Sequence, residues 1–493
     1  MPLYNSYPLI IILILFISAF AIPLFKSIRM ARIIGLSAAG VSLVLSVLTL
    51  SGVRADGPYY FRVGHFAAPW GIEFHIGIIE GLMAVLFMTV SMAVLWFSIY
   101  SIDHDLTKKK IPLFYTLVNL LVGSLLGIVF SDDLFNCFVF IEISSIASCG
   151  IVVIKDKKEN IKAALKYLIL SSLGSGLVLM GIALIYSLTG HLNMASSHEV
   201  LVAIYPEHSR NMLIAIGLFT VGLGVKSAMF PLHTWLPDAH TYAPAVSSAL
   251  LSALVLKAYV ILYIKIIYRV FGMGIVSELP VLNIVLLLGA VGMIAGSVLA
   301  IMQKNLKRMV AYSSVAQIGY VFFGIGLGTT MGLAAAIFQI FNHAFTKAAL
   351  FLSAGSIIEK TGKKNIADLK GIGKEMPFTL AIFAIGGMSL VGIPLLSGFN
   401  SKWNFAVAAI EAQRVELLAV VLVSSLLNAL YYFPVIINGY FGEESLEGKV
   451  YKNKERPVKE LLPILVLVLG IIYLGVSGGG LLSLIEAGIP AIK

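Results

Sequence analysis

Ionisable side chains interrupt an otherwise apolar stretch, residues 222–263. The titratable residues within it are Lys226, His233, Asp238, His240 and Lys257. A charge at bilayer depth is costly, so such residues usually belong to ion or proton pathways. Pro231, Pro237 and Pro244 also prevent one continuous helix here. Because broken helices near the midplane are common in ion-translocating proteins, the stretch predicts proton transfer or ion pairing.

Three charged residues are expected deep inside predicted membrane spans. Glu142 follows Asp133 by about nine residues, which puts it roughly 14 Å into its span at ~1.5 Å per residue. A carboxyl group there binds a proton unless a cation is nearby. Glu142 therefore serves either proton binding or a structural hydrogen bond, and we expect the first. Lys226 and Lys257 are similarly deep and too far from a helix end to reach water easily.

The second half of the chain carries a similar set of polar residues. His343 and Lys347 are four residues apart, so they share one helix face. Lys402 follows Pro394, where we expect a second helix break. We expect His343, Lys347 and Lys402 to serve a proton path.

The residues around the first break allow two interpretations. Pro231 is expected to make the break, and His233 and His240 flank it. Near neutral pH these histidines can relay protons. They can equally brace the break through hydrogen bonds, and Asp238 can serve in either way. Both interpretations remain open from the sequence.

Four acidic or basic residues have plainer explanations. Asp132 and Asp133 precede a helix and are expected to cap its N-terminus. Glu80 opens a predicted span and is expected to face the outer interface. Lys166 lies near a span end, where its side chain can extend to the interface.

The composition excludes several classes of protein. Of 493 residues, 59% are apolar and only 12% are charged, whereas about a quarter are charged in soluble domains. The net charge of +10 is explained by basic cytoplasmic loops, so we expect no nucleic-acid partner. The two cysteines, Cys137 and Cys149, cannot form an iron–sulfur cluster or a structural zinc site. We therefore expect no cofactor, no metal and no catalytic residue in this chain.

Apolar periodicity predicts an all-α polytopic membrane protein with about fourteen spans. Their expected ranges are 8–25, 33–52, 76–100, 112–131, 133–154, 161–189, 212–230, 243–264, 281–302, 307–329, 331–358, 377–398, 416–441 and 460–477. The seventh and twelfth are expected to be broken helices that continue into 231–242 and 399–413.

Basic residues alternate between the predicted loops. Most lysines and arginines follow odd-numbered spans, including Lys449 and Lys452, and few follow even-numbered spans. Lys265 and Arg269 are expected in the loop after the eighth span. Because cytoplasmic loops carry the excess of positive charge, both termini are expected outside.

Four segments resemble the antiporter-like subunits shared by respiratory complex I, Mrp-type cation/proton antiporters, and membrane-bound hydrogenase and sulfane reductase complexes. They are GVKSAMFPLHTWLPDAHTYAPAVSSALL, LKRMVAYSSVAQIGY, FNHAFTKAALFL and GIPLLSGFNSKW. The resemblance covers about residues 60–440. It implies two inverted five-helix repeats at 112–270 and 271–441, between an N-terminal part at 1–111 and a C-terminal part at 442–493.

The resemblance also implies roles for individual residues. Glu142 would pair with Lys226, Lys257 would be the central lysine, and Lys402 would end the proton path. His343 and Lys347 match positions that lie between Lys257 and Lys402. The absence of a C-terminal lateral helix favours a D-type Mrp subunit or its equivalent in a hydrogenase-like complex.

Three functional hypotheses follow. The first is a proton-translocating subunit of an ion-pumping complex, with or without Na⁺ exchange. A redox reaction or ion exchange elsewhere in the complex would drive it. Its partners would be other membrane subunits, further antiporter-like subunits, a redox module and the lipid of a prokaryotic plasma membrane. The second is an independent cation/proton antiporter or solute carrier, which the lysine-rich interior disfavours. The third is a structural subunit with a vestigial channel.

Overall fold

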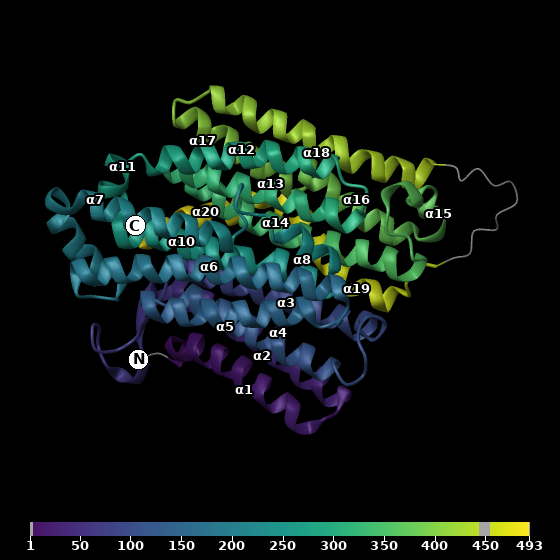
Figure 1. Cartoon of the computed structure of the whole chain (residues 1–493), viewed down its shortest axis with the longest axis horizontal. Coiled ribbons are helices and arrows are strands. Elements are labelled where there is room, and N and C mark those ends of the chain that lie inside the picture. Colours follow the sequence, from purple (N-terminus) through teal and green to yellow (C-terminus); the bar gives the residue numbers. More distant parts are fainter. Residues whose placement is uncertain (1–2, 443–453, 493) are drawn as a thin grey trace, which may run out of the picture.

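The computed structural model describes residues 3–442 and 454–492. Long helices run side by side through the whole molecule (Figure 1). α1 (Tyr7–Phe25) and α2 (Ile28–Asp56) lie along one edge, and α18 (Glu416–Phe441) lies along the opposite edge (Figure 1). Lys449, Lys452 and the C-terminal Lys493 fall outside the described residues.

The elements follow one another as four groups. The N-terminal group also contains η1 (Leu3–Ser6), β1 (Tyr59–Arg62), η2 (Val63–His65), β2 (Glu73–Ile76) and α3 (Ile78–Asp105). The second contains α4 (Ile111–Phe130), α5 (Leu134–Val153), α6 (Lys158–Thr189), α7 (Met194–Lys226), α8 (Leu236–Tyr242), α9 (Ala245–Leu250), η3 (Leu251–Val255), α10 (Leu256–Lys265), η4 (Ile266–Phe271) and α11 (Gly272–Glu278). The third contains α12 (Val281–Ile301), α13 (Leu306–Gly326), α14 (Thr330–Thr361), η5 (Ile366–Leu369), α15 (Ile372–Glu375), α16 (Pro377–Val391), α17 (Ser397–Glu411) and α18. The last contains α19 (Val458–Val476), α20 (Gly478–Gly488) and η6 (Ile489–Ala491).

The core lies around the helical run 245–278, together with α13 and α14. The comparison uses the most apolar stretch of each helix. All residues of that stretch are buried in the run 245–278 (100%), and 94% are buried in α13 and in α14. The corresponding share is only 33% in α2 and α18. A helix that is apolar all round belongs in the centre of a bundle, while a peripheral helix leaves one apolar face for lipid or partners.

Twelve helices among the described residues are long and apolar enough to cross a membrane. This confirms a polytopic helical membrane protein. The two predicted spans outside this set are the interrupted ones. α7 ends at Lys226 and α8 begins at Leu236, and α16 ends at Val391 before α17 begins at Ser397.

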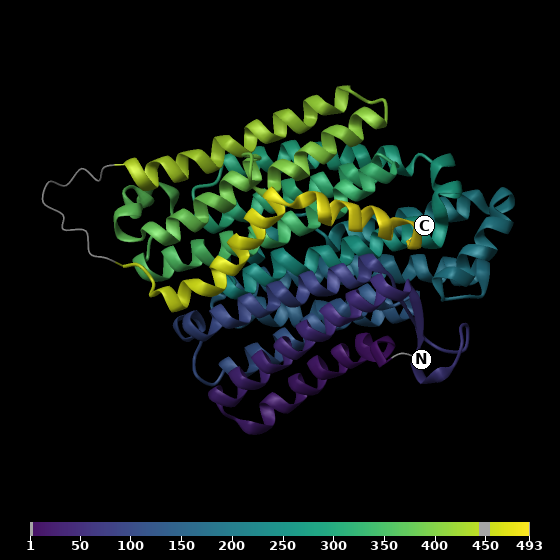
Figure 2. The same ribbon diagram turned by 180° about the vertical axis from the view of Figure 1, so that it is seen from behind.

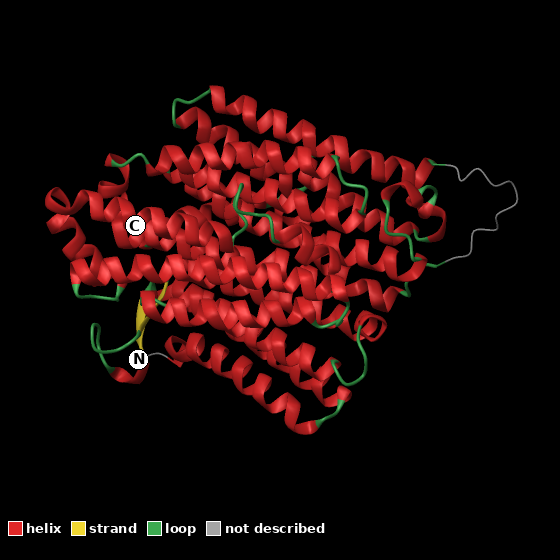
Figure 3. Ribbon diagram, in the orientation of Figure 1, coloured by secondary structure: helices red, strands yellow, loops and turns green. Residues whose placement is uncertain are grey.

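The structure corrects three expectations about the elements. β1 and β2 form an antiparallel hairpin, paired from Tyr59 with Ile76 to Arg62 with Glu73, so the chain is not entirely helical (Figure 3). Aromatic and β-branched residues favour such pairing. α7 begins at Met194 and is kinked at His208, so a further helical segment precedes the predicted seventh span, which begins at residue 212. The predicted eighth span continues to Glu278 as the helical run 245–278.

The C-terminal helices lie across the bundle, where α19 and α20 pack against α3 and α14 (Figure 2). Side-chain caps set several helix starts within the bundle. Asp133 accepts from the backbone N–H of Asn136 at the start of α5, at 2.7 Å. Asn193 and Asn305 cap α7 and α13 in the same way, each at 3.1 Å. These caps satisfy backbone donors that would otherwise lack partners.

Candidate functional site

Glu142 and Lys226 form the first part of the site. The Lys226 Nζ, at the last residue of α7, lies 4.0 Å from the Glu142 Oε1 on α5. Lys226 also donates to the hydroxyls of Ser145 (2.6 Å) and Ser171 (2.9 Å). The Lys226 side chain is 1% exposed, whereas that of Glu142 is 38% exposed. The pair thus joins a buried cation to a carboxylate at the surface of the bundle.

The break after Lys226 is held by hydrogen bonds. Pro231 lies in the interruption and cannot donate a backbone hydrogen bond. The indole nitrogen of Trp235 donates to the carbonyl of Val225 at 2.8 Å. The backbone N–H of Met229 donates to the carbonyl of Gly224, also at 2.8 Å. Carbonyls freed by the break therefore have partners inside the protein, as a membrane segment requires.

Lys257 occupies the centre of the bundle and is fully buried. It follows η3, a short π-helical segment in which the ordinary helix hydrogen bonds are displaced. Its Nζ donates to the carbonyl of Ser252 in that segment. The Ser252 hydroxyl is hydrogen-bonded to Ser314 of α13 at 3.0 Å. The widened helix thus supplies the oxygen that holds the central lysine.

His343 and Lys347 project from one face of α14 and are fully buried. Lys347 donates to the carbonyl of Val310 at 2.9 Å and to the Ser313 hydroxyl. Among the described residues, neither ring nitrogen of His343 has a hydrogen-bond partner. His343 lies within electrostatic reach of Lys257 and Lys347. It can therefore accept a proton between the two lysines.

Lys402 is held at the second break, where Pro394 separates α16 from α17. Its Nζ donates to the carbonyl of Val391, the last residue of α16, at 2.7 Å. It also donates to the Ser425 hydroxyl of α18 at 2.5 Å. The break frees a carbonyl that the lysine then binds.

A cluster of uncharged polar side chains lies between α14 and Lys402. Gln339 is at its centre, with hydrogen bonds to Gln317 (2.7 Å), Asn342 (2.8 Å) and Ser401 (2.6 Å). Asn342 also accepts from Ser397 at 2.7 Å. This amide–hydroxyl cluster therefore joins the residue before His343 to the residue before Lys402. Residue type alone did not reveal it, because such residues in spans are usually helix-packing positions.

Asp238, His233 and His240, the residues near the first break, differ in their contacts. Asp238 forms ion pairs with Lys166 (2.8 Å) and Arg308 (3.1 Å), which tie α8 to α6 and α13. These pairs favour its support of the break. His233 is buried and stacks on Phe230.

His240 is fully buried, stacks on Phe351, and has no hydrogen-bond partner on either ring nitrogen among the described residues. It lies within electrostatic reach of Lys257 and Lys347. Its free nitrogens leave a proton-relay role open.

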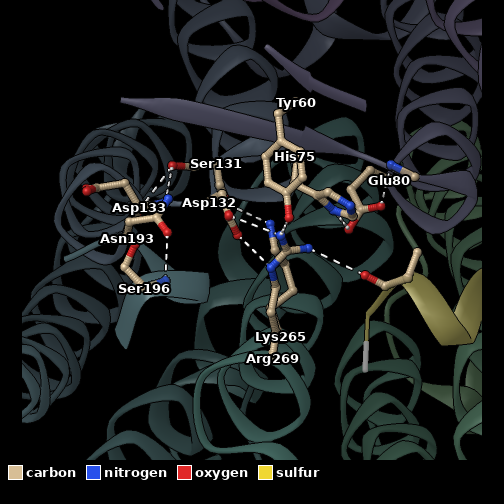
Figure 4. A network of polar contacts seen from close by, with 12 residues as sticks. Tyr60, His75, Glu80, Ser131, Asp132, Asp133, Asn193, Ser196, Lys265 and Arg269 are labelled. Carbon is tan, nitrogen blue, oxygen red and sulfur yellow. Dashed lines mark hydrogen bonds and ion pairs between the residues drawn. The ribbon is translucent and has the colours of Figure 1, made fainter. Parts of the chain in front are cut away.

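A second buried ionic network was not expected (Figure 4). Asp132 is not a helix cap, because its carboxylate pairs with Arg269 at 2.8 Å. Lys265 and Arg269 are not in a loop, because they belong to the helical run 245–278. Glu80 is 1% exposed and does not face the outer interface. Opposite charges nearby lower the cost of burying these residues. Their pairing cannot be read from the positions of charged residues along the sequence.

The described residues contain no group of three or more His, Cys, Asp or Glu side chains that could hold a metal ion. The arrangement is suited instead to proton transfer between lysine, histidine and carboxylate groups.

The fold and these buried residues define an antiporter-like membrane subunit. The family described as "NADH:quinone oxidoreductase/Mrp antiporter, TM" matches residues 131–428. The chain is 35% identical to the N-type subunit of the NADH-quinone oxidoreductase of Desulforudis audaxviator, over 96% of each chain. It is 31% identical to the D-type subunit of the Na(+)/H(+) antiporter of Alkalihalophilus pseudofirmus, over 96% of this chain and 94% of the relative.

Solved structures of such complexes share the fold. A chain of the membrane-bound sulfane sulfur reductase, an archaeal respiratory membrane complex, superposes with a TM-score of 0.90 and 29% identity, covering 99% of this chain and 98% of that one. A chain of the Mrp complex from Dietzia has a TM-score of 0.89 at 24% identity, covering 100% and 98%. The chain belongs to the NADH:quinone oxidoreductase/Mrp antiporter family of membrane subunits, so the resemblance is confirmed.

Proposed function

We propose that this chain is a proton-translocating membrane subunit of a multisubunit complex. The observation that carries the proposal is the buried Lys226 ammonium 4.0 Å from the half-exposed Glu142 carboxylate. From there a proton would pass in turn to Lys257, His343, Lys347 and Lys402. The amide–hydroxyl cluster around Gln339 supports the last step because it links α14 to α17.

The Glu142–Lys226 pair is the step that a partner can control. Two charges 4 Å apart attract by at most about 4 kcal/mol at an effective dielectric of 20. A neighbouring subunit that changes the position of Glu142 would therefore release the proton of Lys226 towards Lys257. The energy would come from a redox module or from ion exchange elsewhere in the complex.

We further propose fourteen membrane crossings, with the two interrupted helices as the seventh and twelfth. An isolated β-bridge joins Asp133 to Asn193, and another joins Asn305 to Asn365. Asn305 and Asn365 follow Asp133 and Asn193 by the same number of residues. This correspondence supports repeats at 112–270 and 271–441, and an offset of five spans makes them inverted.

The names of the relatives favour a subunit over an independent transporter. Those named above are called subunits or come from complexes. We propose further antiporter-like subunits as neighbours, in the plasma membrane of a prokaryote with both termini outside. A transporter that acts alone stays the second candidate, and transport by the purified full chain in liposomes would favour it.

The test is proton pumping by the intact complex in liposomes. Glu142→Gln and Lys226→Ala should each reduce pumping severalfold, because each removes one charge of the controlling pair. Lys157→Ala is the matched control, since Lys157 is an exposed lysine at the N-terminus of α6. Wild-type pumping in both site variants would refute the proposal.

A further inference from the structure

The second ionic network lies at the end of the bundle that carries the hairpin (Figure 4). It gathers residues from four separate parts of the chain. These are His75 of β2, Glu80 of α3, Asp132 between α4 and α5, and Lys265 and Arg269 of the run 245–278. All five are less than 9% exposed. The proposed path through the middle of the bundle uses none of them.

Three of these groups are held by an ion pair or by backbone carbonyls. Arg269 binds both oxygens of Asp132, at 2.8 and 3.1 Å, and donates to the Tyr60 hydroxyl at 2.7 Å. Lys265 donates to the carbonyls of Val129 (2.9 Å) and Ser131 (2.6 Å). These contacts hold the α4–α5 connection, the hairpin and the central helix together. Because Lys265 and Arg269 are held by these partners, we do not assign proton transfer to either of them.

His75 and Glu80 are farther apart than Asp132 and Arg269, whose ion pair is 2.8 Å long. Their Nδ1 and Oε1 atoms lie 3.9 Å apart, and neither atom has a hydrogen-bond partner among the described residues. The other oxygen of Glu80 accepts from the backbone N–H of Gly77 at 3.0 Å. With Glu80 and Asp132 ionised, two carboxylates balance Lys265 and Arg269, so a proton bound by His75 adds one positive charge.

The pair lies between the surface and the central helix. The His75 ring packs against Tyr60, with ring centroids 5.1 Å apart, and Tyr60 is 45% exposed. A partly exposed aromatic side chain therefore lies against the His75 ring. Towards the interior, Lys265 is on the same helix as Lys257, eight residues away, or roughly 12 Å at ~1.5 Å per residue.

We propose that His75 and Glu80 form a proton-exchange site between the path around Lys257 and the aqueous phase on the hairpin side. A proton from that phase binds the free Nδ1 of His75 and gives an imidazolium beside the Glu80 carboxylate. Release returns the same proton to water or to the interior. The inference rests on the proposed proton translocation. The titratable or charged groups that face or neighbour the pair are Tyr60, Glu73, Asp132, Lys265 and Arg269.

The test varies the pH on the hairpin side of liposomes that contain the intact complex. Wild-type pumping should depend on this pH between about 5 and 8, where histidine changes charge. His75→Gln should lower pumping severalfold and remove the dependence. His65→Gln is the matched control, because His65 is exposed on the same connection, and it should behave as wild type. Wild-type pumping with unchanged pH dependence in His75→Gln overturns the proposal.

A second measurement follows the proton directly. Nuclear magnetic resonance of the ¹⁵N-histidine-labelled full chain should contain a signal that changes with pH and is lost in His75→Gln. In Glu80→Gln the signal should titrate at lower pH, because the imidazolium loses its counterion. If His75→Gln does not assemble, contact with Tyr60 assigns the signal in the wild type. A His75 signal that does not titrate overturns the proposal.

The two proposals can fail separately. If Glu142→Gln and Lys226→Ala stop pumping but His75→Gln does not, the proposed role of the Glu142–Lys226 pair is supported and the proposed exchange site at His75 and Glu80 is refuted. If Glu142→Gln and Lys226→Ala pump normally, the proposal that protons pass through this subunit is refuted, whatever the result for His75→Gln.

Discussion

The lysines of the proposed path bind neutral oxygens. Lys257, Lys347 and Lys402 donate to backbone carbonyls and serine hydroxyls, and only Lys226 has a carboxylate nearby. A lysine with neutral partners can lose its proton without leaving an unpaired buried anion, whose cost is high. The choice of partner therefore separates Lys257, Lys347 and Lys402 from Arg269, which pairs with the Asp132 carboxylate.

Gln339 is the residue on which the link to Lys402 depends. Gln339→Leu should remove its bonds to Gln317, Asn342 and Ser401. Each buried group left without a partner costs about 1–3 kcal/mol. We expect severalfold slower pumping and a lower melting temperature in the assembled complex. Gln303→Leu, in the connection before α13, is the control, and equal pumping by both variants would contradict the role of Gln339.

The titratable residues of the site could be predicted from the sequence, and their uncharged neighbours could not. Glu142, Lys226 and Lys257 stand out because a charge in an apolar span is costly and usually functional. Ser397 and Ser401 do not, since serine is ordinary in membrane helices. Their role depends on which helices pack together, which is known only from the tertiary structure.

At the scale of elements, the second break depends on close packing of α17 against α16. A Cβ atom at Gly398 would lie 1.7 Å from the carbonyl oxygen of Ser389. Gly398→Ala should therefore separate the two helices and lower stability by about 1–3 kcal/mol, as overpacking does. Pumping should fall with it, because the backbone N–H of Gly398 donates to the Ser389 hydroxyl, which is bonded to Ser397.

A matched substitution controls for the change from glycine to alanine. Gly176 lies within α6, and a Cβ atom there would meet nothing within 4 Å. Gly176→Ala should leave the melting temperature unchanged or raise it, since alanine favours a helix by roughly 0.5–1 kcal/mol. A Gly398→Ala complex as stable as Gly176→Ala would contradict the packing argument.

The ends of the elements were harder to predict than their existence. Lys265 and Arg269 suggested the end of a span, yet they continue the central helix because Asp132 and two carbonyls compensate them. The part of α7 before its kink at His208 was missed because its first turns are polar. In both cases local charge indicated a loop, while partners distant in the sequence allow a helix.

At the scale of the molecule, the apolar spans and the family motifs were sufficient to predict a polytopic helical bundle. The hairpin was not predicted, because it rests on pairing between two short segments within a polar connection. The similarity between the two halves is faint in the sequence. The matching bridges of Asp133 with Asn193 and Asn305 with Asn365 support the proposed repeats.

The charge distribution predicts the orientation of the whole chain. Cysteines introduced at His65 and Lys157, both exposed, should react with a membrane-impermeant thiol reagent from opposite sides. We expect labelling at position 65 in intact cells and at position 157 only after the cells are opened. Cys137 and Cys149 are replaced by alanine in this experiment. The reverse pattern would contradict the proposed orientation.

The proposed proton path requires that the buried central lysine, Lys257, releases its proton. Lys257→Arg tests this most directly, because arginine keeps the charge but does not release its proton. In liposomes that contain the intact complex, Lys257→Arg should lose pumping to the same extent as Lys257→Ala, with normal assembly of both. Wild-type pumping by Lys257→Arg would mean that a fixed charge suffices, and it would contradict proton transfer through this residue.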